Sequence, residues 1–294
     1  MKHLLSIKDL SLEEIEKIFS LAEDVRDNPE RFRSSLKQKV FALIFHKPSL
    51  RTRISFEVGI FQMGGKALYL EKEIGFPERE AIKDIARVLS VYLHGVIIRT
   101  FSHQLLLEFA AYSQIPVINA LSDLLHPCQV LSDLFTIKQK KGDLKKVKLA
   151  YIGDGNNVCH SLIYGCAKTN TSLSIATPAR YLPSSKIVEE AGGKVEIGNN
   201  PQEAVKGADV VYTDVWTSMG KEKEREERKK EFSGFQVNED LLKKAKPDCL
   251  LMHCLPAHRG EEVTDQVIEG KQSIVFDQAE NRLYVQKAIL LLIN

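Results

Sequence analysis

Two hydroxyl groups and two guanidinium groups follow one another early in the chain, within the run Ser49, Leu50, Arg51, Thr52 and Arg53. The unbroken apolar residues 40–45 before them are typical of a strand that is buried on both faces. From residue 52 the apolar positions follow a rough helical spacing until the glycine pair 64–65, which predicts a helix. The hydroxyls and arginines therefore lie at a strand-to-helix turn, where the unpaired N–H groups and the dipole of the helix favour an anion. We expect a phosphate site here, because the alternative, an ordinary helix cap, needs one hydroxyl and no arginine.

Donors of the same kind follow two further predicted strands. Arg99 ends the apolar strand 96–98, and His126 and Gln129 flank a proline at the start of a predicted helix. Read alone, Arg99 could form a surface salt bridge and His126 could be a structural cap. Because ligands of open parallel sheets bind beyond the carboxyl ends of the strands, these residues and the turn at 49–52 together predict one anion-binding site.

Three residues in the second half of the chain also stand where chemistry could take place. Asp214 lies near a strand end, where a carboxylate is costly unless a cationic ligand group or a neighbouring Lys or Arg pairs with it. Cys254 stands where the apolar strand 250–253 meets Pro256; buried cysteines are usually inert, but this edge of the sheet is the active one. Arg282 precedes an apolar terminal helix and could reach the same site, although it is a weak signal by itself.

The glycine-containing loop at residues 153–157 approaches a dinucleotide-binding fingerprint without satisfying it. Val158 occupies the place of the third glycine, and no acidic residue closes the next strand. We therefore expect no nicotinamide cofactor, and we expect the asparagines of this loop to serve a small polar ligand. The almost wholly charged segment 221–231 is predicted to be a solvated helix rather than a mobile flap.

The elements that must position these residues form two successive series of strands and helices. The predicted strands lie near 40–45, 67–70, 96–98 and 116–118, and then near 147–152, 173–176, 194–197, 210–215, 250–253 and 274–276. Helical segments fall between most of them, so we predict an α/β fold of two doubly wound, open parallel-sheet domains. Residues 142–146 mark the expected boundary, which gives domains at 1–142 and 143–280.

The balance of charge excludes a global attraction to nucleic acid or to a membrane surface. The chain has 41 Lys and Arg against 39 Asp and Glu, so anion binding must be local. The amino-terminal residues are interrupted by charge too early for a signal peptide, and the longest apolar run, near 288–293, is too short to span a bilayer. The five cysteines contain no C-x-x-C pair, so we expect neither disulfides nor a zinc site, and we expect a reducing cytoplasm.

Four motifs together resemble the ornithine carbamoyltransferases, and the resemblance covers essentially the whole chain. In order they are S-x-R-T-R at 49–53, H-P-x-Q at 126–129, D-x-x-x-S-M-G at 214–220 and H-C-L-P at 253–256. The first two are shared across carbamoyltransferases, and the last two are specific to the ornithine branch. The resemblance implies transfer of the carbamoyl group of carbamoyl phosphate to the side-chain amine of L-ornithine, which gives L-citrulline and phosphate in arginine biosynthesis. It implies no cofactor and no metal.

The same resemblance implies roles for individual residues. Carbamoyl phosphate would be bound by Ser49, Leu50, Arg51, Thr52, Arg99, His126, Gln129, Cys254, Leu255 and Arg282, of which Arg51, Arg99, His126 and Cys254 would be catalytic. Ornithine would be bound by Asn157, Asp214, Ser218 and Met219. Residues 1–142 would then be the carbamoyl-phosphate domain, with the terminal helix 281–294 packed back on it, and the active site would lie in the cleft between the domains. The family forms homotrimers or multiples of trimers.

Two positions depart from the pattern of the family. Leu50 stands where Thr or Ser is usual, which matters little if this position contributes mainly its backbone N–H. The loop 71–80 is short and has Gly75 near the place where many members have a glutamine that contributes to the phosphate site. The sequence therefore does not predict the glutamine contact with the phosphate site for this chain.

Single residues distinguish ornithine from other acceptor substrates, and an active enzyme from a non-catalytic binding protein. Aspartate is disfavoured because that branch has Pro at the position of Cys254, and acetylornithine is disfavoured because Asp214 and residues 218–220 match a free α-amino group. Putrescine or another amine remains an open alternative. A non-catalytic binding module on the same fold would be expected to lack Arg51, His126 or Cys254, and none of them is missing.

Overall fold

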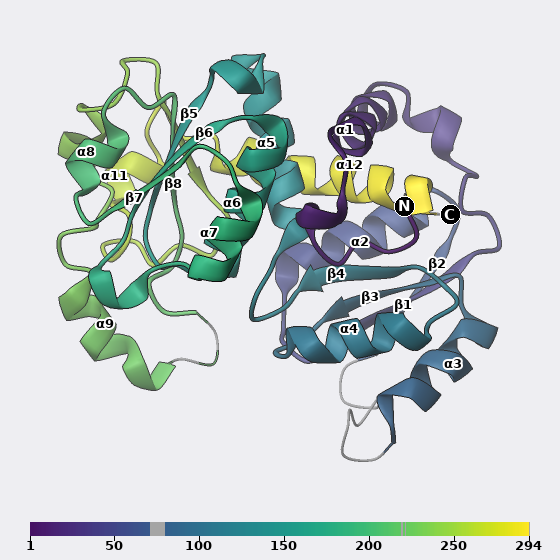
Figure 1. Cartoon of the computed structure of the whole chain (residues 1–294). Helices are drawn as coiled ribbons and strands as arrows, with labels where there is room; N and C mark the ends of the chain where they lie inside the picture. The colour runs from purple at the N-terminus through teal and green to yellow at the C-terminus, as the bar shows by residue number, and fades with distance from the viewer. Residues whose placement is uncertain (71–79, 219, 221, 294) are drawn as a thin grey trace. The chain divides into compact units, whose positions relative to one another are not determined.

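The structure, a computed structural model, describes residues 1–70, 80–218, 220 and 222–293, which divide into two compact units (Figure 1). Unit 1 comprises Met1–Ser132 and Glu280–Asn294, and unit 2 comprises Asp133–Ala279. Both limits fall inside helices, α5 (Pro127–Lys141) and α12 (Val275–Ile293), which continue from one unit into the other. The boundary expected at 142 lies just after α5 ends at Lys141, whereas the two compact units divide between Ser132 and Asp133.

Unit 1 contains a parallel sheet of four strands in the order β2-β1-β3-β4. The strands are β1 (Val40–Phe45), β2 (Lys66–Leu70), β3 (Gly95–Arg99) and β4 (Val117–Leu121). Every residue of β3 is buried, and so is every residue of β1 after Val40. This burial explains the unbroken apolar runs, because helices cover both faces of a parallel sheet. The four strands predicted for the first half of the chain are confirmed, with small shifts at their ends.

The helices of unit 1 lie on both faces of this sheet. Besides α5 and α12 they are α1 (Leu12–Asp27), α2 (Leu50–Gln62), α3 (Ile82–Tyr92) and α4 (His103–Tyr112), with 3-10 segments η1 (Ile7–Asp9) and η2 (Pro29–Phe32). Ile85 of α3 and Phe109 of α4 pack into one core cluster with Ile44 and Ile98 of the sheet. Helices α1, α2 and α12 lie on the opposite side (Figure 1). The capping serines Ser11 and Ser102 begin α1 and α4.

Unit 2 contains a parallel sheet of five strands in the order β7-β6-β5-β8-β9. The strands are β5 (Lys148–Ile152), β6 (Ser172–Ala176), β7 (Val195–Gly198), β8 (Val210–Thr213) and β9 (Leu250–His253). The helices are α6 (Asn157–Thr169), α7 (Ser185–Ala191), α8 (Pro201–Val205), α9 (Arg225–Glu231), α10 (Glu239–Leu242) and α11 (Asp265–Ile268), with 3-10 segments η3 (Leu144–Lys146), η4 (Ala179–Tyr181) and η5 (Glu222–Glu224). Helices α6 and α7 lie on one side of the sheet, and α8 and α11 lie on the other (Figure 1). The predicted fold of two open parallel sheets is therefore confirmed.

The predicted strand at 274–276 is wrong, because these residues lead into α12. Leu251 makes a single bridge to Ser273, through hydrogen bonds to Gln272 and Ile274, and the pairing goes no further. The N–H of Gln278 then donates to the carbonyl of Ile274, which starts the helical pattern. Arg282 consequently lies inside α12 and does not precede the terminal helix. A short apolar run fits a buried helix start as well as a strand, and tertiary packing decided between them.

Within the described residues, no helix combines the length and the apolar character needed to cross a bilayer.

Candidate active site

The turn between β1 and α2 has the local structure that its sequence predicts. Ser49 is the N-cap of α2, and its Oγ accepts a hydrogen bond of 3.3 Å from the N–H of Thr52. Thr52 is buried, whereas the side chain of Leu50 is 73% exposed. Any contribution of Leu50 to a ligand at this turn is therefore more naturally made by its backbone N–H than by its side chain.

Arg282 joins two of the other predicted site residues in unit 1. Its Nη2 donates to Thr52 Oγ1 at 3.1 Å, and its Nη1 donates to Gln129 Oε1. All three side chains are almost completely buried. Because they come from α12, α2 and α5, one guanidinium group fixes the relative positions of three helices at this site.

His126 is buried close to several positive charges of the same unit. Burial lowers the pKa of His126 well below its ordinary value, and the charges of Arg282, Arg99 and Arg51 lower this pKa further. His126 is therefore neutral at pH 7, with one nitrogen able to donate and the other able to accept. Arg99 is the last residue of β3, and His126 directly precedes α5. These guanidinium groups have the geometry and charge to bind a phosphate, and the neutral imidazole can donate to an uncharged oxygen.

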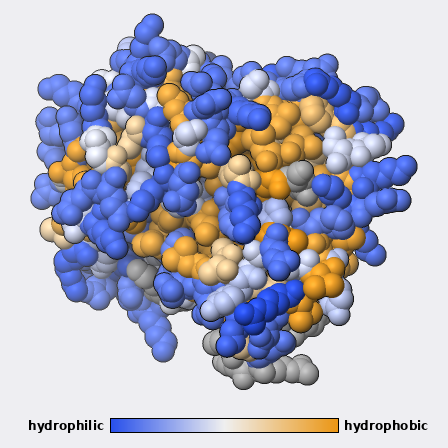
Figure 2. Space-filling view, turned by 45° about the vertical axis from the view of Figure 1, so that its right-hand side comes forward, coloured by the Kyte–Doolittle hydropathy of each residue, from blue (hydrophilic) through white to orange (hydrophobic). Residues whose placement is uncertain are grey.

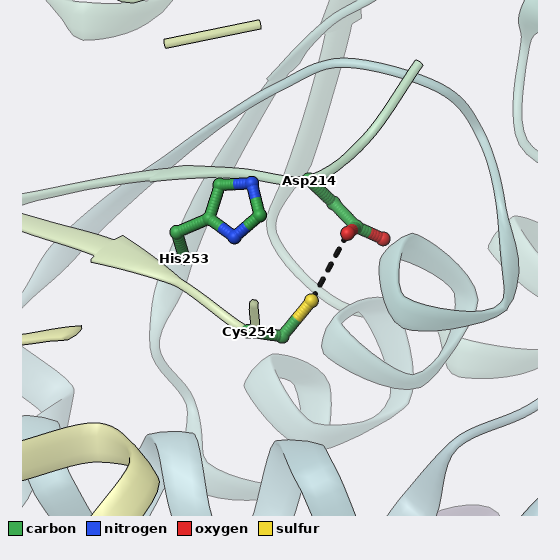
Figure 3. Close-up of side chains that lie close together, drawn as sticks. All are labelled: Asp214, His253 and Cys254. Carbon is green, nitrogen blue, oxygen red and sulfur yellow. Dashed lines mark hydrogen bonds between the residues drawn. The ribbon is translucent and has the colours of Figure 1, made fainter. Parts of the chain in front are cut away.

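A buried carboxylate follows a strand end in unit 2. Asp214 comes directly after β8, and its Oδ2 accepts a hydrogen bond of 2.7 Å from Asn156 Nδ2. Its Oδ1 accepts from the N–H of Val215 at 2.8 Å and from the thiol of Cys254 at 3.0 Å (Figure 3). No Lys or Arg of the described chain is among these contacts. The ion pair considered as an alternative for Asp214 is thus absent from this part of the structure, and the carboxylate can receive a cationic ligand group.

The turn after β9 is held by a buried histidine. His253 Nδ1 accepts a hydrogen bond of 2.8 Å from the N–H of Leu255, so the ring proton lies on Nε2, which donates to Glu262 Oε1 at 3.2 Å. Leu255 has φ of +55°, a conformation that is unfavourable for a residue with a branched side chain. Such backbone strain is found most often at functional sites. Figure 3 shows the thiol of Cys254 facing Asp214, with the ring of His253 beside them.

The sequence did not reveal the role of Asn156. Its Oδ1 accepts from the N–H groups of Val158 and Cys159 and so caps α6, while its Nδ2 holds Asp214. The amide expected to serve a ligand instead orients the carboxylate, and Asn157 beside it is the first, half-buried residue of α6. An Asn directly before a helical stretch is a recognisable cap, so this part of its role was readable.

Arg228 corrects the expectation of a wholly solvated charged helix. The segment does form η5 and α9, but Arg228 is only 2% exposed and forms an ion pair of 2.9 Å with the buried Asp154. Charge composition alone does not distinguish one buried arginine from its exposed neighbours.

Met219, which is expected to bind ornithine, lies outside the described residues. The loop 71–79, where Gly75 departs from the pattern of the family, also lies outside them. Ser218 is described and half-buried. The contacts expected of Ser218 and Met219 with ornithine remain predictions.

Two groups of side chains in unit 2 have the composition of a metal site. The potential ligand atoms of Asp214, His253 and Cys254 lie within 4.8 Å of one another, as do those of His258, Glu261 and Glu262. In the first group both ring nitrogens of His253 already take part in hydrogen bonds. In the second, Glu261 pairs with two cationic side chains, Arg225 and Lys229. These contacts favour an organic substrate over a metal ion as the ligand of the Asp214 site.

Comparisons with known proteins agree with the two-unit arrangement of the chain. Residues 2–139 match the family model "Aspartate/ornithine carbamoyltransferase, carbamoyl-P binding domain", and residues 145–293 match "Aspartate/ornithine carbamoyltransferase, Asp/Orn binding domain". An ornithine carbamoyltransferase of Archaeoglobus fulgidus is 55% identical, over 99% of this chain and 97% of the relative. The solved structure of ornithine carbamoyltransferase from Pyrococcus furiosus is 49% identical with a TM-score of 0.95, and the similarity covers 99% of this chain and 96% of that one. The anabolic enzyme from Campylobacter jejuni is 44% identical with a TM-score of 0.94, over 100% and 99% of the two chains.

Proposed function

The chain belongs to the aspartate/ornithine carbamoyltransferase family, and we propose that it transfers the carbamoyl group of carbamoyl phosphate to the side-chain amine of L-ornithine, giving L-citrulline and phosphate. The observation that carries the choice of acceptor is the carboxylate of Asp214. It is buried, and within the described chain it contacts an amide, a backbone N–H and a thiol but no basic side chain. A substrate with a free α-ammonium group supplies the missing positive charge.

In this proposal the donor substrate is bound by unit 1. Ser49, the backbone of Leu50, Arg51 and Thr52 hold the phosphate at the start of α2, where the helix dipole favours negative charge. Arg99, His126 and Gln129 polarise the carbamoyl oxygen, and Arg282 completes the set through its bonds to Thr52 and Gln129. Each donor aimed at charge that develops in the transition state is typically worth about 3 kcal/mol.

The acceptor is bound by residues of unit 2. Asp214 receives the α-amino group and, with Asn157, Ser218 and Met219, binds the amino-acid end of ornithine. Cys254 and Leu255 line the place where the side-chain amine reacts. An alkylamine has a pKa of about 10.4, so removing its proton at pH 7 costs about 4–5 kcal/mol. Few acidic groups around this nitrogen would help to keep it neutral.

The reaction joins one nitrogen to one carbonyl carbon. The neutral δ-amine attacks the carbonyl carbon of carbamoyl phosphate, a C–N bond forms, and the bond from carbon to the phosphate oxygen breaks. The proton lost by the amine is balanced by the departing phosphate, which is released as hydrogen phosphate. Arg51, Arg99 and the neutral His126 stabilise the negative charge that grows on the carbonyl oxygen and on the departing phosphate. The chemistry requires no cofactor.

Three further properties form part of the proposal. The reaction runs toward citrulline in arginine biosynthesis, since the Campylobacter jejuni relative is called anabolic. The enzyme works in the cytoplasm. Residues 1–142 with 281–294 serve carbamoyl phosphate, and residues 143–280 serve ornithine.

We also propose that the chain forms a homotrimer or a multiple of trimers. Large apolar side chains are exposed on α3 and α4 of unit 1, namely Val88, Val91, Tyr92, Leu107 and Tyr112. Figure 2 shows hydrophobic surface gathered in patches on an otherwise hydrophilic face. Exposed apolar patches commonly mark contacts between proteins, and sedimentation of the purified chain would test the oligomeric state.

One assay tests the activity and its main alternative. Purified protein is given carbamoyl phosphate with ornithine, acetylornithine, aspartate or putrescine, and the carbamoylated product is measured. We expect citrulline from ornithine at a kcat/KM far above that for the other amines. Faster carbamoylation of putrescine than of ornithine would replace the proposed acceptor, and no product from any amine would refute the proposed activity.

A further inference from the structure

We infer that Arg228 and Asp154 are positioning residues for the amino-acid acceptor: together they fix the backbone between Asp214 and Ser218. This inference rests on the proposed function, because it assumes that Asp214 and Ser218 bind the acceptor. Neither Arg228 nor Asp154 is itself assigned a contact with substrate.

The guanidinium group of Arg228 forms the centre of the arrangement. Its Nη1 donates to Asp154 Oδ2 at 2.9 Å and to the carbonyl of Trp216 at 2.8 Å. Its Nε donates to Glu224 Oε2 at 2.9 Å, and its central carbon lies 4.5 Å from the ring centroid of Tyr181. A planar group with several fixed donors can join these partners at once, which a lysine ammonium on a flexible stem does not reproduce.

Trp216 connects Arg228 to the proposed acceptor site. It lies two residues after Asp214 and two residues before Ser218, so a bond to its carbonyl constrains the chain between them. Its indole stacks on Phe232, with 5.7 Å between ring centroids and 22° between ring planes. Backbone and side chain of Trp216 are therefore both held by the segment that carries Arg228.

Asp154 connects the same contact to the loop before α6. Tyr151 Oη and the N–H of Asn156 both donate to the carbonyl of Asp154, at 2.9 Å and 2.7 Å. Two residues along the chain, Asn156 holds the carboxylate of Asp214. The loop before α6 therefore positions Asp214 through the amide of Asn156. It also positions the backbone after Asp214 through the ion pair of Asp154 with Arg228.

The burial of this ion pair separates it from the other charges of α9. Arg180 pairs with Glu227 at 2.5 Å and Arg225 pairs with Glu261 at 2.6 Å, but the arginines and Glu227 are largely exposed. Exposed pairs contribute little to stability because water screens them. Buried pairs are also poor stabilisers compared with apolar packing, but losing one partner leaves a charge without compensation. The buried pair is therefore better suited to fixing a position than to adding stability.

The test compares substitutions in the buried pair with a matched substitution in an exposed pair on the same helix. The variants are Arg228→Met, Arg228→Lys, Asp154→Asn and the double variant Asp154→Asn/Arg228→Met, and the control is Glu227→Gln. For each, kcat and the KM for ornithine and for carbamoyl phosphate are measured, together with circular dichroism. Arg228→Lys keeps a cation beside Asp154 and serves as the informative variant if Arg228→Met does not fold.

We expect the single substitutions to raise the KM for ornithine about tenfold, the loss of roughly one charge-assisted hydrogen bond, while the KM for carbamoyl phosphate stays within about twofold. Arg228→Lys should lie between Arg228→Met and the wild type. The double variant should be no worse than the worse single variant, because the two residues act as one unit. Glu227→Gln should leave both KM values unchanged.

Three results would overturn the inference. They are an unchanged KM for ornithine in the folded variants, an equal rise in both KM values, and a Glu227→Gln effect as large as that of Arg228→Lys. In each of these cases the proposed function would still stand if the wild type forms citrulline. A wild type that forms no citrulline would overturn the proposed function and, with it, this inference.

Discussion

Unit 1 gathers three guanidinium groups around a neutral histidine, whereas unit 2 presents one buried carboxylate that an amide, a backbone N–H and a thiol contact. In unit 1, burial and then the charges of Arg282, Arg99 and Arg51 lower the pKa of His126 well below its ordinary value. In unit 2 the charge of Asp214 is stabilised by donors that do not neutralise it. The two sites thus favour ligands of opposite charge, an anion in unit 1 and an ammonium group in unit 2.

The two sites also differ in where the groups that form them come from. The positive groups of unit 1 come from several elements, α2, β3 and α12, and desolvation strengthens their attraction for an anion. The carboxylate of unit 2 is oriented by neighbours within its own sheet edge, chiefly Asn156 and Cys254. We therefore expect substitutions in unit 1 to affect chemistry most, and those in unit 2 to affect acceptor binding most.

The largest effect is expected from Arg51→Ala. Loss of a guanidinium that stabilises the departing phosphate should lower kcat about 100- to 1,000-fold while the fold is kept. Steady-state kinetics and circular dichroism measure these two quantities. Near-normal turnover would remove Arg51 from this role.

Arg53→Ala is the matched control for this prediction. Arg53 lies two residues further along α2, but its Nε pairs with Glu57 at 3.1 Å and its guanidinium lies 3.6 Å from the ring centroid of Tyr69. It should keep most of kcat. Equal losses in the two variants would mean that the helix, and not the position of Arg51, determines the effect.

A smaller effect, on binding, is expected from Asp214→Asn. A hydrogen bond to a charged group is worth about 1.5–3 kcal/mol, so the KM for ornithine should rise about 10- to 100-fold. The KM for carbamoyl phosphate should change little. If both KM values rise together, Asp214 does not distinguish the acceptor site from the donor site.

Asp209→Asn provides the comparison from the other end of β8. Asp209 is as deeply buried as Asp214, but it pairs with Lys246 at 2.6 Å and accepts from the N–H of Lys148 at 2.9 Å. Its replacement should lower the free energy of unfolding and leave the KM for ornithine unchanged. A KM effect equal to that of Asp214→Asn would refute the special role of a buried carboxylate that, within the described chain, contacts no basic side chain.

The pH dependence of stability tests the burial of His126 beside the arginines of unit 1. Since the pKa of His126 is lowered on folding from its ordinary value of 6.5, the unfolded chain binds the proton more readily than the folded one. The stability associated with this histidine is complete above pH 6.5 and is lost as the pH falls below 6.5 toward the folded pKa, at up to about 1.4 kcal/mol per pH unit. Urea unfolding of the wild type and of His126→Gln between pH 7 and pH 5 should give curves that converge or cross as the pH falls. A constant difference between them would show that the histidine is not desolvated beside the arginines.

The smallest effect is expected from Ser49 and Ser102, which are the N-caps of two helices of unit 1. Ser49 caps α2 and Ser102 caps α4, with an Oγ that accepts from the N–H of Leu105 at 3.2 Å. Each Ser→Ala variant should lose about 1 kcal/mol of stability, measured by denaturant unfolding. Only Ser49→Ala should also raise the KM for carbamoyl phosphate. If both variants leave that KM unchanged, the hydroxyl of Ser49 acts as a cap alone.

Much of the fold was readable from short stretches of sequence. The strands Val40–Phe45 and Leu250–His253 have the limits that their residues predict, and α5 starts at Pro127 as predicted. Each depends on local features, such as an unbroken apolar run or a proline at the first helical position. The run at 274–276 was misread because its apolar residues fit either element.

The sequence by itself determined where charged and polar groups stand relative to strand ends, since apolar periodicity and helix caps act over a few residues. Only the tertiary structure decided which of these groups meet. Thr52 and Arg282 are 230 positions apart, and nothing local to either residue specifies their hydrogen bond. The same holds for Asn156 with Asp214 and for Arg228 with Asp154, because the partner of a long polar side chain is selected by burial and by the packing of distant elements.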